Sequence, residues 1–325
     1  MKLSIVTTLY RSAPYLPEFY RRISAAVQSL TGDYEIIFVN DGSPDESLGV
    51  ALDLFERDDH VRVVDLSRNF GHHKAMMTGL SYAQGDFIFL IDCDLEEPPE
   101  LLTTFYQTLT NSDADVVYGV QAERKRGVFD ALTSRTFYKV FNFLSDHPIP
   151  ENLLTIRLMT RRYNHWLVQH RERQFVISGL WQLTGFKQIP LVVDKAFKGE
   201  STYTFIRKAL YLIYAIAVFS NKPLIYITYL GLLMVLPSGL YIIVLVLQYL
   251  VGGVGVDGWA SVIVSLWFLG GLIISILGVI AIYLSVIFVE SKDRPYTVIR
   301  DVYQRDTHLP AGESSPAHAS SLYHS

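Results

Sequence analysis

Five acidic residues follow a short apolar run in the first third of the chain, and they have the chemistry of a cation site. In the stretch DFIFLIDCDLEEPPELL, which begins at Asp86, the five carboxylates after the apolar run are Asp92, Asp94, Glu96, Glu97 and Glu100. Side chains alternate along an extended segment, so Asp92, Asp94 and Glu96 are predicted to project to one side. Three carboxylates on one side repel each other unless a cation lies between them, and hard oxygen ligands favour Mg²⁺ or Mn²⁺. The pattern predicts a divalent-metal site that substrate phosphates complete.

The competing interpretation of this stretch is a helix cap. The PPE at residues 98–100 has the composition of a helix start, because proline is favoured in the first turn. Capping of that helix explains Glu97 and Glu100, but it gives no reason for Asp92 and Asp94. We therefore assign the first part of the stretch to metal and nucleotide, and Glu97 and Glu100 to the start of the helix.

A second candidate loop is VNDGSPDES, residues 39–47, which follows a predicted strand. An aspartate at a strand end can bind the ribose hydroxyls or the base edge of a nucleotide, and Asp41 has that position. An Asx turn followed by a helix N-cap explains the same residues, and the loop taken alone favours that explanation. Asp41 is therefore a candidate nucleotide-binding residue only in combination with the other loops.

The third candidate loop is SRNFGHHKAMMTGL, residues 67–80, which opens a predicted helix. Arg68 and Lys74, together with the helix N-terminus, could hold a phosphate of a nucleotide. An ordinary surface helix start explains the loop equally well. His72 and His73 are adjacent, which is poor spacing for two zinc ligands on one helix face, so a zinc site is disfavoured.

The elements that must position these loops alternate between strand and helix. Short β-rich runs are separated by segments with helical spacing, at residues 3–9, 34–39, 61–66, 86–91 and 115–120. This alternation predicts an α/β fold with a doubly wound, mostly parallel sheet. Ligands of such folds bind at the carboxyl ends of the strands, where all three loops lie.

Two later stretches are long and apolar enough to cross a bilayer. Residues 224–251 and 259–289 each exceed the about 20 residues that a spanning helix needs, and between 224 and 289 the only charged residue is Asp257. Basic residues lie before the first stretch and after the second, so both flanks are predicted to be cytoplasmic. The sequence thus predicts a multi-pass protein of the inner (plasma) membrane, anchored by a two-helix hairpin; a hairpin inside a soluble core is disfavoured.

The chain divides into four predicted parts. Residues 1–202 form a cytoplasmic domain, 203–223 lie in the plane of the membrane interface, 224–289 form the hairpin, and 290–325 form a cytoplasmic tail with a disordered end. The net charge of −4 gives no signature of nucleic-acid binding, and the single cysteine, Cys93, excludes an intramolecular disulfide. Because basic residues flank both apolar stretches, the soluble domain and both termini are expected in the cytoplasm.

These three loops, in this order, resemble the family 2 glycosyltransferases. Together with SRNFGHHKA, DCDLEEPPE, GESTYTFIRK, FSNKPL and RPYTVIRD, they look like the polyprenyl-phosphate sugar transferases, the type that includes dolichol-phosphate mannose synthase. The resemblance implies a GT-A-like nucleotide-sugar domain that uses Mg²⁺ or Mn²⁺. It implies inverting transfer of a hexose from a nucleotide sugar, UDP-linked, to polyprenyl phosphate during assembly of the cell envelope. It further implies that Asp94 and Glu96 ligate the metal and that Asp92 lies near the ribose or the metal.

The sequence departs from the family pattern at the position of an active-site acid. ENLLTIRLM, residues 151–159, has Thr155 where the family carries an aspartate, and Ser178 and Gln121 stand where arginines are expected. A hydroxyl acceptor needs a base to take its proton. A phosphomonoester acceptor does not, because its second pKa is about 6 and it is largely ionised at pH 7. The loss of the acid is therefore compatible with a lipid-phosphate acceptor.

Basic residues could hold the phosphate of such an acceptor. They lie in ERKRG after the fifth predicted strand and in segments that the family places near the membrane: Arg124, Lys125, Arg126, Arg135, Arg157, Arg207 and Lys208. Attraction to an anionic lipid surface, at about 1 kcal/mol for each basic residue, explains ERKRG equally well.

Two other functions stay open from the sequence. One is a transferase that extends a lipid-linked saccharide or another hydroxyl acceptor, which the departures at Thr155, Ser178 and Gln121 favour. The other is a non-catalytic membrane scaffold whose domain only binds nucleotide. Two spans per chain would need a homo-oligomer to form a sugar pathway across the membrane. The sugar and the lipid length cannot be read from the residues.

Overall fold

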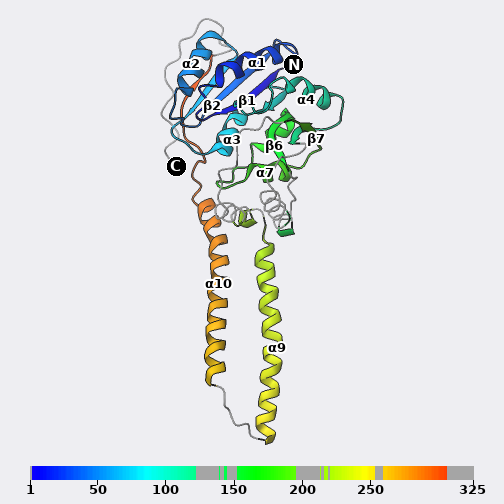
Figure 1. The fold of residues 1–325 in the computed structure, drawn as a ribbon, viewed down its shortest axis with the longest axis vertical. Helices are drawn as coiled ribbons and strands as arrows, with labels where there is room; N and C mark the ends of the chain where they lie inside the picture. The colour runs from blue at the N-terminus through cyan, green and yellow to red at the C-terminus, as the bar shows by residue number, and fades with distance from the viewer. Residues whose placement is uncertain are drawn as a thin grey trace, which may run out of the picture.

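A single mixed sheet forms the centre of the protein (Figure 1). The computed structural model describes residues 2–121, 139, 143–144, 152–194, 213, 216–218, 220–252 and 259–305. Its strands are β1 (Leu3–Leu9), β2 (Tyr34–Asn40), β3 (Val61–Leu66), β4 (Phe87–Leu90), β5 (Val116–Gln121), β6 (Leu153–Thr160), β7 (Gln188–Val193) and β8 (Ile299–Tyr303). Its helices are α1 (Leu16–Gln28), α2 (Ser47–Arg57), α3 (His72–Tyr82), α4 (Leu101–Thr110), α6 (Arg161–Leu167), α7 (Ile177–Leu183), α9 (Lys222–Gly252) and α10 (Trp259–Ser291).

The strand order is β7-β5-β6-β4-β1-β2-β3-β8. β1 pairs in parallel with β2 and β4, and β2 pairs in parallel with β3. β6 lies antiparallel between β4 and β5, and β8 is antiparallel to β3. The α/β class and all five expected strands are confirmed. β5 pairs in parallel with β7, so the expectation of a mostly parallel sheet is confirmed, and β6 and β8 are the two strands that reverse the direction.

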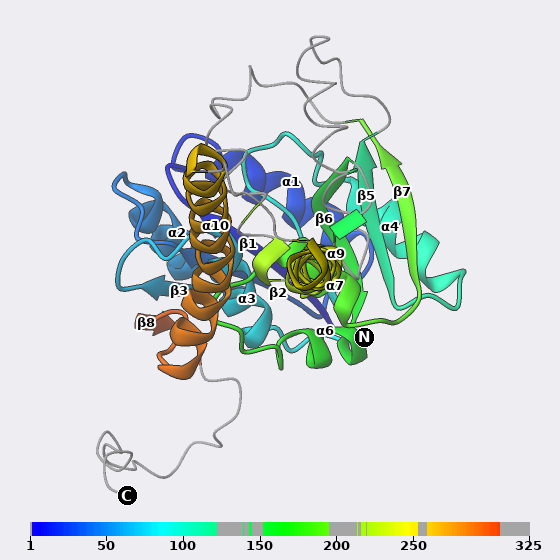
Figure 2. The same ribbon diagram turned by 90° about the horizontal axis from the view of Figure 1, so that it is seen from below.

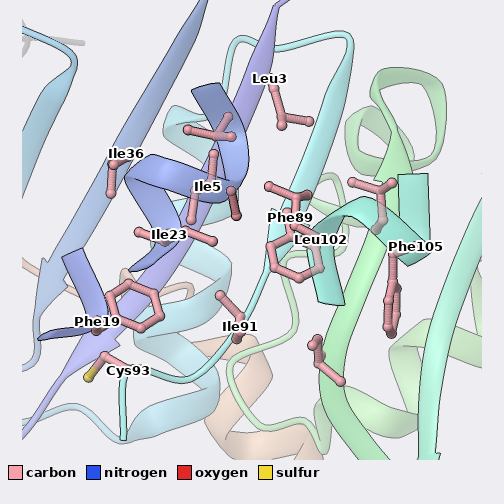
Figure 3. Close-up of a cluster of buried hydrophobic side chains, with 14 of the residues drawn as sticks. Leu3, Ile5, Phe19, Ile23, Ile36, Phe89, Ile91, Cys93, Leu102 and Phe105 are labelled. Carbon is pink, nitrogen blue, oxygen red and sulfur yellow. The ribbon is translucent and has the colours of Figure 1, made fainter. Parts of the chain in front are cut away.

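Two apolar layers hold the central strands on both faces. β1 and β2 are buried along their whole length, and alternate residues of each face opposite layers. Leu3 and Ile5 pack with Phe19 and Ile23 of α1 and with Phe105 of α4 (Figure 3). On the other face Val6 packs in the same layer as residues of α3, α6 and α7. The ends of these strands are thereby fixed from both sides.

Two long helices project from the sheet domain (Figure 1). α9 has 31 residues and α10 has 33, so both stretches that were predicted to span are helical. Among the described residues, one segment, Ser265–Ser291, is long and apolar enough to cross a membrane by length and composition. A hairpin of two spans is therefore not established. Most of the expected interfacial segment, 203–223, lies outside the described residues.

The chain returns to the sheet after α10. Figure 2 shows the end of α10 on the side of β8. β8 extends the sheet by pairing with β3, and Arg300 forms an ion pair with the buried Asp65 at 3.2 Å. The expectation that residues 290–325 form a tail is therefore wrong for this strand, because its apolar and β-branched residues complete an otherwise open sheet edge. The predicted disorder after residue 305 lies outside the described residues.

Candidate active site

Asp41 follows β2 and holds the loop that follows β3. Its carboxylate accepts hydrogen bonds from the backbone N–H groups of Phe70 at 2.7 Å and Gly71 at 3.0 Å. The residue is 2% exposed. Asp41, which was predicted to bind a nucleotide, thus fixes the loop that opens α3.

Gly42 lets the two loops approach each other. Its φ is +57°, and a Cβ at this position would lie 2.3 Å from the carbonyl carbon of Arg68 and 2.4 Å from the nitrogen of Asn69. Both atoms belong to the backbone, which cannot move aside as a side chain can. Glycine is required here for its conformation and for the close contact.

His72, the first residue of α3, connects the ends of β1 and β4. Its Nδ1 lies 2.9 Å from the Thr8 hydroxyl, and its Nε2 lies 3.3 Å from Asp92. Loss of solvent lowers the pKa of the imidazole, but the hydrogen bond with Asp92 and the negative charges around it outweigh this effect and raise that pKa. A protonated His72 donates from both nitrogens, so it can orient the Asp92 carboxylate.

His73 differs from its neighbour in charge. Burial and the positive charge of His72 lower its pKa to about 4, so the ring is neutral at pH 7. The described residues contain no cluster of three His, Cys, Asp or Glu side chains that could hold a metal ion. That finding covers the two histidines and the carboxylates after β4 alike, so the expectation that the histidines form no zinc site stays a prediction.

The acidic stretch after β4 is a turn rather than an extended segment. β4 ends at Leu90, Leu95 has a φ of +64°, and the Glu96 N–H donates to the Asp94 carboxylate at 3.0 Å. Strand alternation is therefore the wrong reason for grouping these carboxylates. Cys93 lies in the core (Figure 3), where burial raises the pKa of its thiol to about 11.

The donor set of this turn still fits Mg²⁺ or Mn²⁺. Asp92, Asp94 and Glu96 are partly exposed, and they offer only carboxylate oxygens. Mg²⁺ is commonly held by one or two protein carboxylates together with water and substrate phosphates, so a full protein cage is not required. Two carboxylates two residues apart in one turn, with a third side chain oriented by His72, meet that requirement chemically.

The remaining two acidic residues of the stretch have different environments. Glu97 is fully buried and directly precedes the turn at Pro98 that leads into α4. Its expected role at the start of that helix stays a prediction. Glu100 stands directly before α4, and both its oxygens accept from the Arg22 guanidinium, at 2.7 and 2.5 Å. Glu100 thus fastens α4 to α1.

Arg68 and Lys74 lie on the same loop and helix start as His72. The Arg68 guanidinium is exposed and stacks on Phe70, 4.1 Å from the ring centre. Loss of solvent and the charge of Arg68 lower the pKa of the Lys74 amine, and Glu290 acts in the opposite direction. The two predicted phosphate-binding residues thus lie on the same loop and helix start, and their positive charges act on each other.

Thr155 and Arg157 lie on β6, a strand that was not expected. Arg157 is fully buried, and its guanidinium carbon lies 2.9 Å from the ring centre of Trp181 in α7. Its Nε donates to the Thr155 carbonyl at 3.3 Å. Burial lowers the pKa of this guanidinium, and among the described residues no acidic side chain pairs with it. This position suits a residue that holds Thr155 and α7 in place better than one that contacts a phosphate in solvent.

Replacement of Arg157 by methionine is expected to raise the free energy of unfolding by about 2 kcal/mol, because it removes a buried charge that has no acidic partner. Chemical denaturation of the detergent-solubilised protein measures the change. Arg62→Met is the matched control: Arg62 pairs with buried Glu35 at 2.9 Å, so its loss should destabilise by about 3 kcal/mol. Equal destabilisation by both variants would contradict the interpretation of Arg157.

Six predicted acceptor residues, Arg124, Lys125, Arg126, Arg135, Arg207 and Lys208, lie outside the described residues. The structure therefore brings together Asp41, the loop with Arg68 and Lys74, and Asp92. It adds Thr8 and His72, which the sequence interpretation missed as members of the site. The signal that could have found His72 was its place at the start of α3, directly after a strand-end loop.

These features define an α/β domain whose candidate site lies at the carboxyl ends of parallel strands, where ligands of such folds bind. The profile described as "Glycosyl transferase family 2" matches residues 4–167. The chain belongs to this family, and it is a glycosyltransferase.

Relatives match the chain over nearly its whole length. A protein of Mycobacterium tuberculosis named "Putative glycosyltransferases" is 52% identical over 306 residues, which cover 94% of this chain and 90% of the relative. The "Bactoprenol glucosyl transferase" of Shigella phage SfV is 30% identical, with 94% of this chain and 100% of the relative covered. The crystal structure of mannosyl-3-phosphoglycerate synthase from Rubrobacter xylanophilus is similar with a TM-score of 0.48 at 17% identity, over 71% of this chain and 75% of that chain.

Proposed function

We propose that the chain transfers a hexose, with inversion, from a UDP-linked sugar to polyprenyl phosphate at the cytoplasmic face of the membrane. The observation that carries the proposal is the combination, in one chain, of the acidic turn after β4 with a long apolar helix. The similarity to a bactoprenol glucosyl transferase over 94% of the chain supports the same acceptor class.

On the donor side, Asp94 and Glu96 would hold Mg²⁺ or Mn²⁺. When bound, such an ion neutralises the charge that develops on the leaving nucleoside diphosphate. Asp92, oriented by His72, would accept hydrogen bonds from the ribose, and Arg68 and Lys74 would bind the phosphates. These roles follow from the residue types and from their place at the strand ends.

On the acceptor side, the chemistry needs no side-chain base. A phosphate oxygen of the lipid forms a bond with the anomeric carbon, while the bond from that carbon to the nucleoside diphosphate breaks. The phosphomonoester is largely ionised at pH 7, so no aspartate is needed to take a proton from it. Thr155 can therefore occupy the position where the family carries that aspartate. The basic residues of 124–135 and 207–208 would hold the acceptor, and Arg157 would hold β6 beside it.

In this proposal α9 and α10 both cross the membrane. Their lengths of 31 and 33 residues exceed what a spanning helix requires, and Lys222 and Lys292 flank them on the side of the sheet domain. The soluble domain and both flanks of the helices would then be cytoplasmic.

The test uses the full chain reconstituted in vesicles that contain undecaprenyl phosphate. With radiolabelled UDP-sugars and Mg²⁺ or Mn²⁺, we expect a labelled lipid that mild acid hydrolyses, as a lipid monophosphosugar should be. Absence of a labelled lipid with every UDP-sugar would overturn the proposal. A labelled product that resists mild acid would instead support the hydroxyl-acceptor alternative, which the threonine at position 155 and Ser178 in α7 favour.

A further inference from the structure

The end of α10 is fastened to the loop between α6 and α7 by a single carboxylate. Glu290 accepts from the backbone N–H of Arg173 with both oxygens, at 2.8 and 3.0 Å, and from the N–H of Gln174 at 3.0 Å. Hydrogen bonds from backbone N–H groups to an ionised carboxylate are stronger than neutral ones. One side chain of the apolar helix thus fixes two successive peptide groups of the sheet domain.

Three further contacts surround this junction. Arg173 forms an ion pair with Asp293, and the rings of Phe175 and Tyr296 meet edge to face with centres 6.4 Å apart. The hydroxyls of Thr78, in α3, and Thr297 lie 2.9 Å apart. The segment that leaves α10 therefore touches both the loop before α7 and the helix that begins with His72.

The loop that Glu290 holds leads directly into α7. Trp181 of α7 stacks on the Arg157 guanidinium, which donates to the Thr155 carbonyl. The end of α10 is therefore connected with β6, the strand that carries Thr155, through the backbone of the loop before α7, through α7 itself and through Arg157. Figures 1 and 2 show α7 on the face of the sheet domain from which α9 and α10 project.

Without these contacts the connection between helix and sheet would be loose. Residues 292–298 link α10 to β8, and seven extended residues reach about 23 Å. β8 keeps the far end of this link in the sheet through its pairing with β3. The angle and the distance between α10 and the domain depend on the contacts at the near end. Among them Glu290 is the one that lies on α10 itself and holds two backbone N–H groups of the domain.

We propose that Glu290 is a positioning residue that holds the catalytic domain at a fixed height and angle above the bilayer, so that a phosphate acceptor embedded in the membrane reaches the site. The inference rests on the proposed function, because it assumes a lipid-phosphate acceptor. It goes further by assigning the docking of the domain on its membrane helix to one carboxylate. An acceptor that diffuses in water should not need this alignment.

The test compares two acceptors with the full chain in vesicles. One is undecaprenyl phosphate in the bilayer, and the other is geranyl phosphate, which is short enough to act from solution. For Glu290→Ala we expect the KM for undecaprenyl phosphate to rise at least tenfold, with less than a threefold change for geranyl phosphate. UDP affinity should change less than the KM for undecaprenyl phosphate, although Glu290 also acts on the charge of Lys74. Glu290→Gln keeps one acceptor oxygen and should give an intermediate rise.

Asp293→Asn is the matched control on the same segment. Asp293 is 91% exposed, it pairs only with the Arg173 side chain among the described residues, and its φ of +45° suits asparagine. We expect the control to match the wild type with both acceptors. Equal losses with both acceptors in Glu290→Ala, or no loss with either, would overturn the inference. If the wild-type chain modifies neither acceptor, the proposed function itself fails.

Discussion

Replacement of Asp94 by asparagine is expected to lower the rate of sugar transfer about 10³-fold, which corresponds to about 4 kcal/mol of transition-state stabilisation. Asparagine keeps the oxygen that accepts from the Glu96 N–H at 3.0 Å, so the turn after β4 should persist. The substitution removes the negative charge of residue 94, which in our proposal holds a divalent cation against the leaving diphosphate. The free energy of unfolding should change by less than about 0.5 kcal/mol, as for a surface substitution.

Glu100→Gln is the matched control for Asp94→Asn, because it removes one negative charge from the same stretch but at the contact with Arg22. The rate should fall less than twofold in this control. Binding of Mn²⁺, followed by electron paramagnetic resonance in the presence of UDP, provides a readout that does not depend on turnover. Retention of Mn²⁺ binding by Asp94→Asn, together with wild-type turnover, would contradict the metal role of this residue.

The parallel centre of the sheet could be predicted because its strands have a strong local signal. β1 and β3 have the predicted bounds, residues 3–9 and 61–66, since each is a β-branched run bounded by polar residues. β2 extends one residue beyond the prediction, to Asn40, whose side chain donates to Asp65 of the neighbouring strand at 2.7 Å. The contact with β3 extends β2 by this residue, and the residues of β2 alone do not predict such a contact.

The strands at the sides of the sheet could not be predicted in the same way. LLTIRLMT of β6 reads as a strand only when its partners are known, because the buried Arg157 breaks the apolar pattern. β8 follows a long apolar helix, and its register with β3 depends on a chain reversal that no local residue specifies. In both cases tertiary pairing, rather than local propensity, decides the structure.

The candidate site shows the same division between local and non-local information. The acidic residues after β4 and the loop with Arg68 were identified from residue type and position, and the structure keeps them at the strand ends. The link from Thr8 through His72 to Asp92 joins three elements, so it could be seen only in the fold. The role of Asp41 as the holder of the 68–71 loop was hidden for the same reason.

Replacement of Asp41 by asparagine is expected to weaken UDP binding about 30-fold and to lower the stability of the ligand-free protein by about 2 kcal/mol. The Asp41 carboxylate accepts from two backbone N–H groups, Phe70 and Gly71, and the amide of asparagine can accept from only one of them. The other backbone N–H then faces the NH₂ group of the asparagine, which is also a donor, so it loses its hydrogen-bond acceptor. The loop that carries Arg68 and opens α3 should shift as a result, and titration calorimetry with UDP measures the change in affinity.

The loss of stability separates two roles of Asp41, because a residue that only contacted the nucleotide would weaken binding without changing the unfolding of the ligand-free protein. Gly42→Ala tests the same junction from its other side: a Cβ 2.3 Å from the Arg68 backbone should force the loops apart and weaken UDP binding to a similar extent.

Gly32→Ala is the control for Gly42→Ala, since a Cβ at position 32 meets nothing within 4 Å. Asp53→Asn, on the exposed side of α2, controls for charge. Weaker UDP binding in Asp41→Asn with unchanged stability, and normal binding in Gly42→Ala, would show that Asp41 acts on the nucleotide directly.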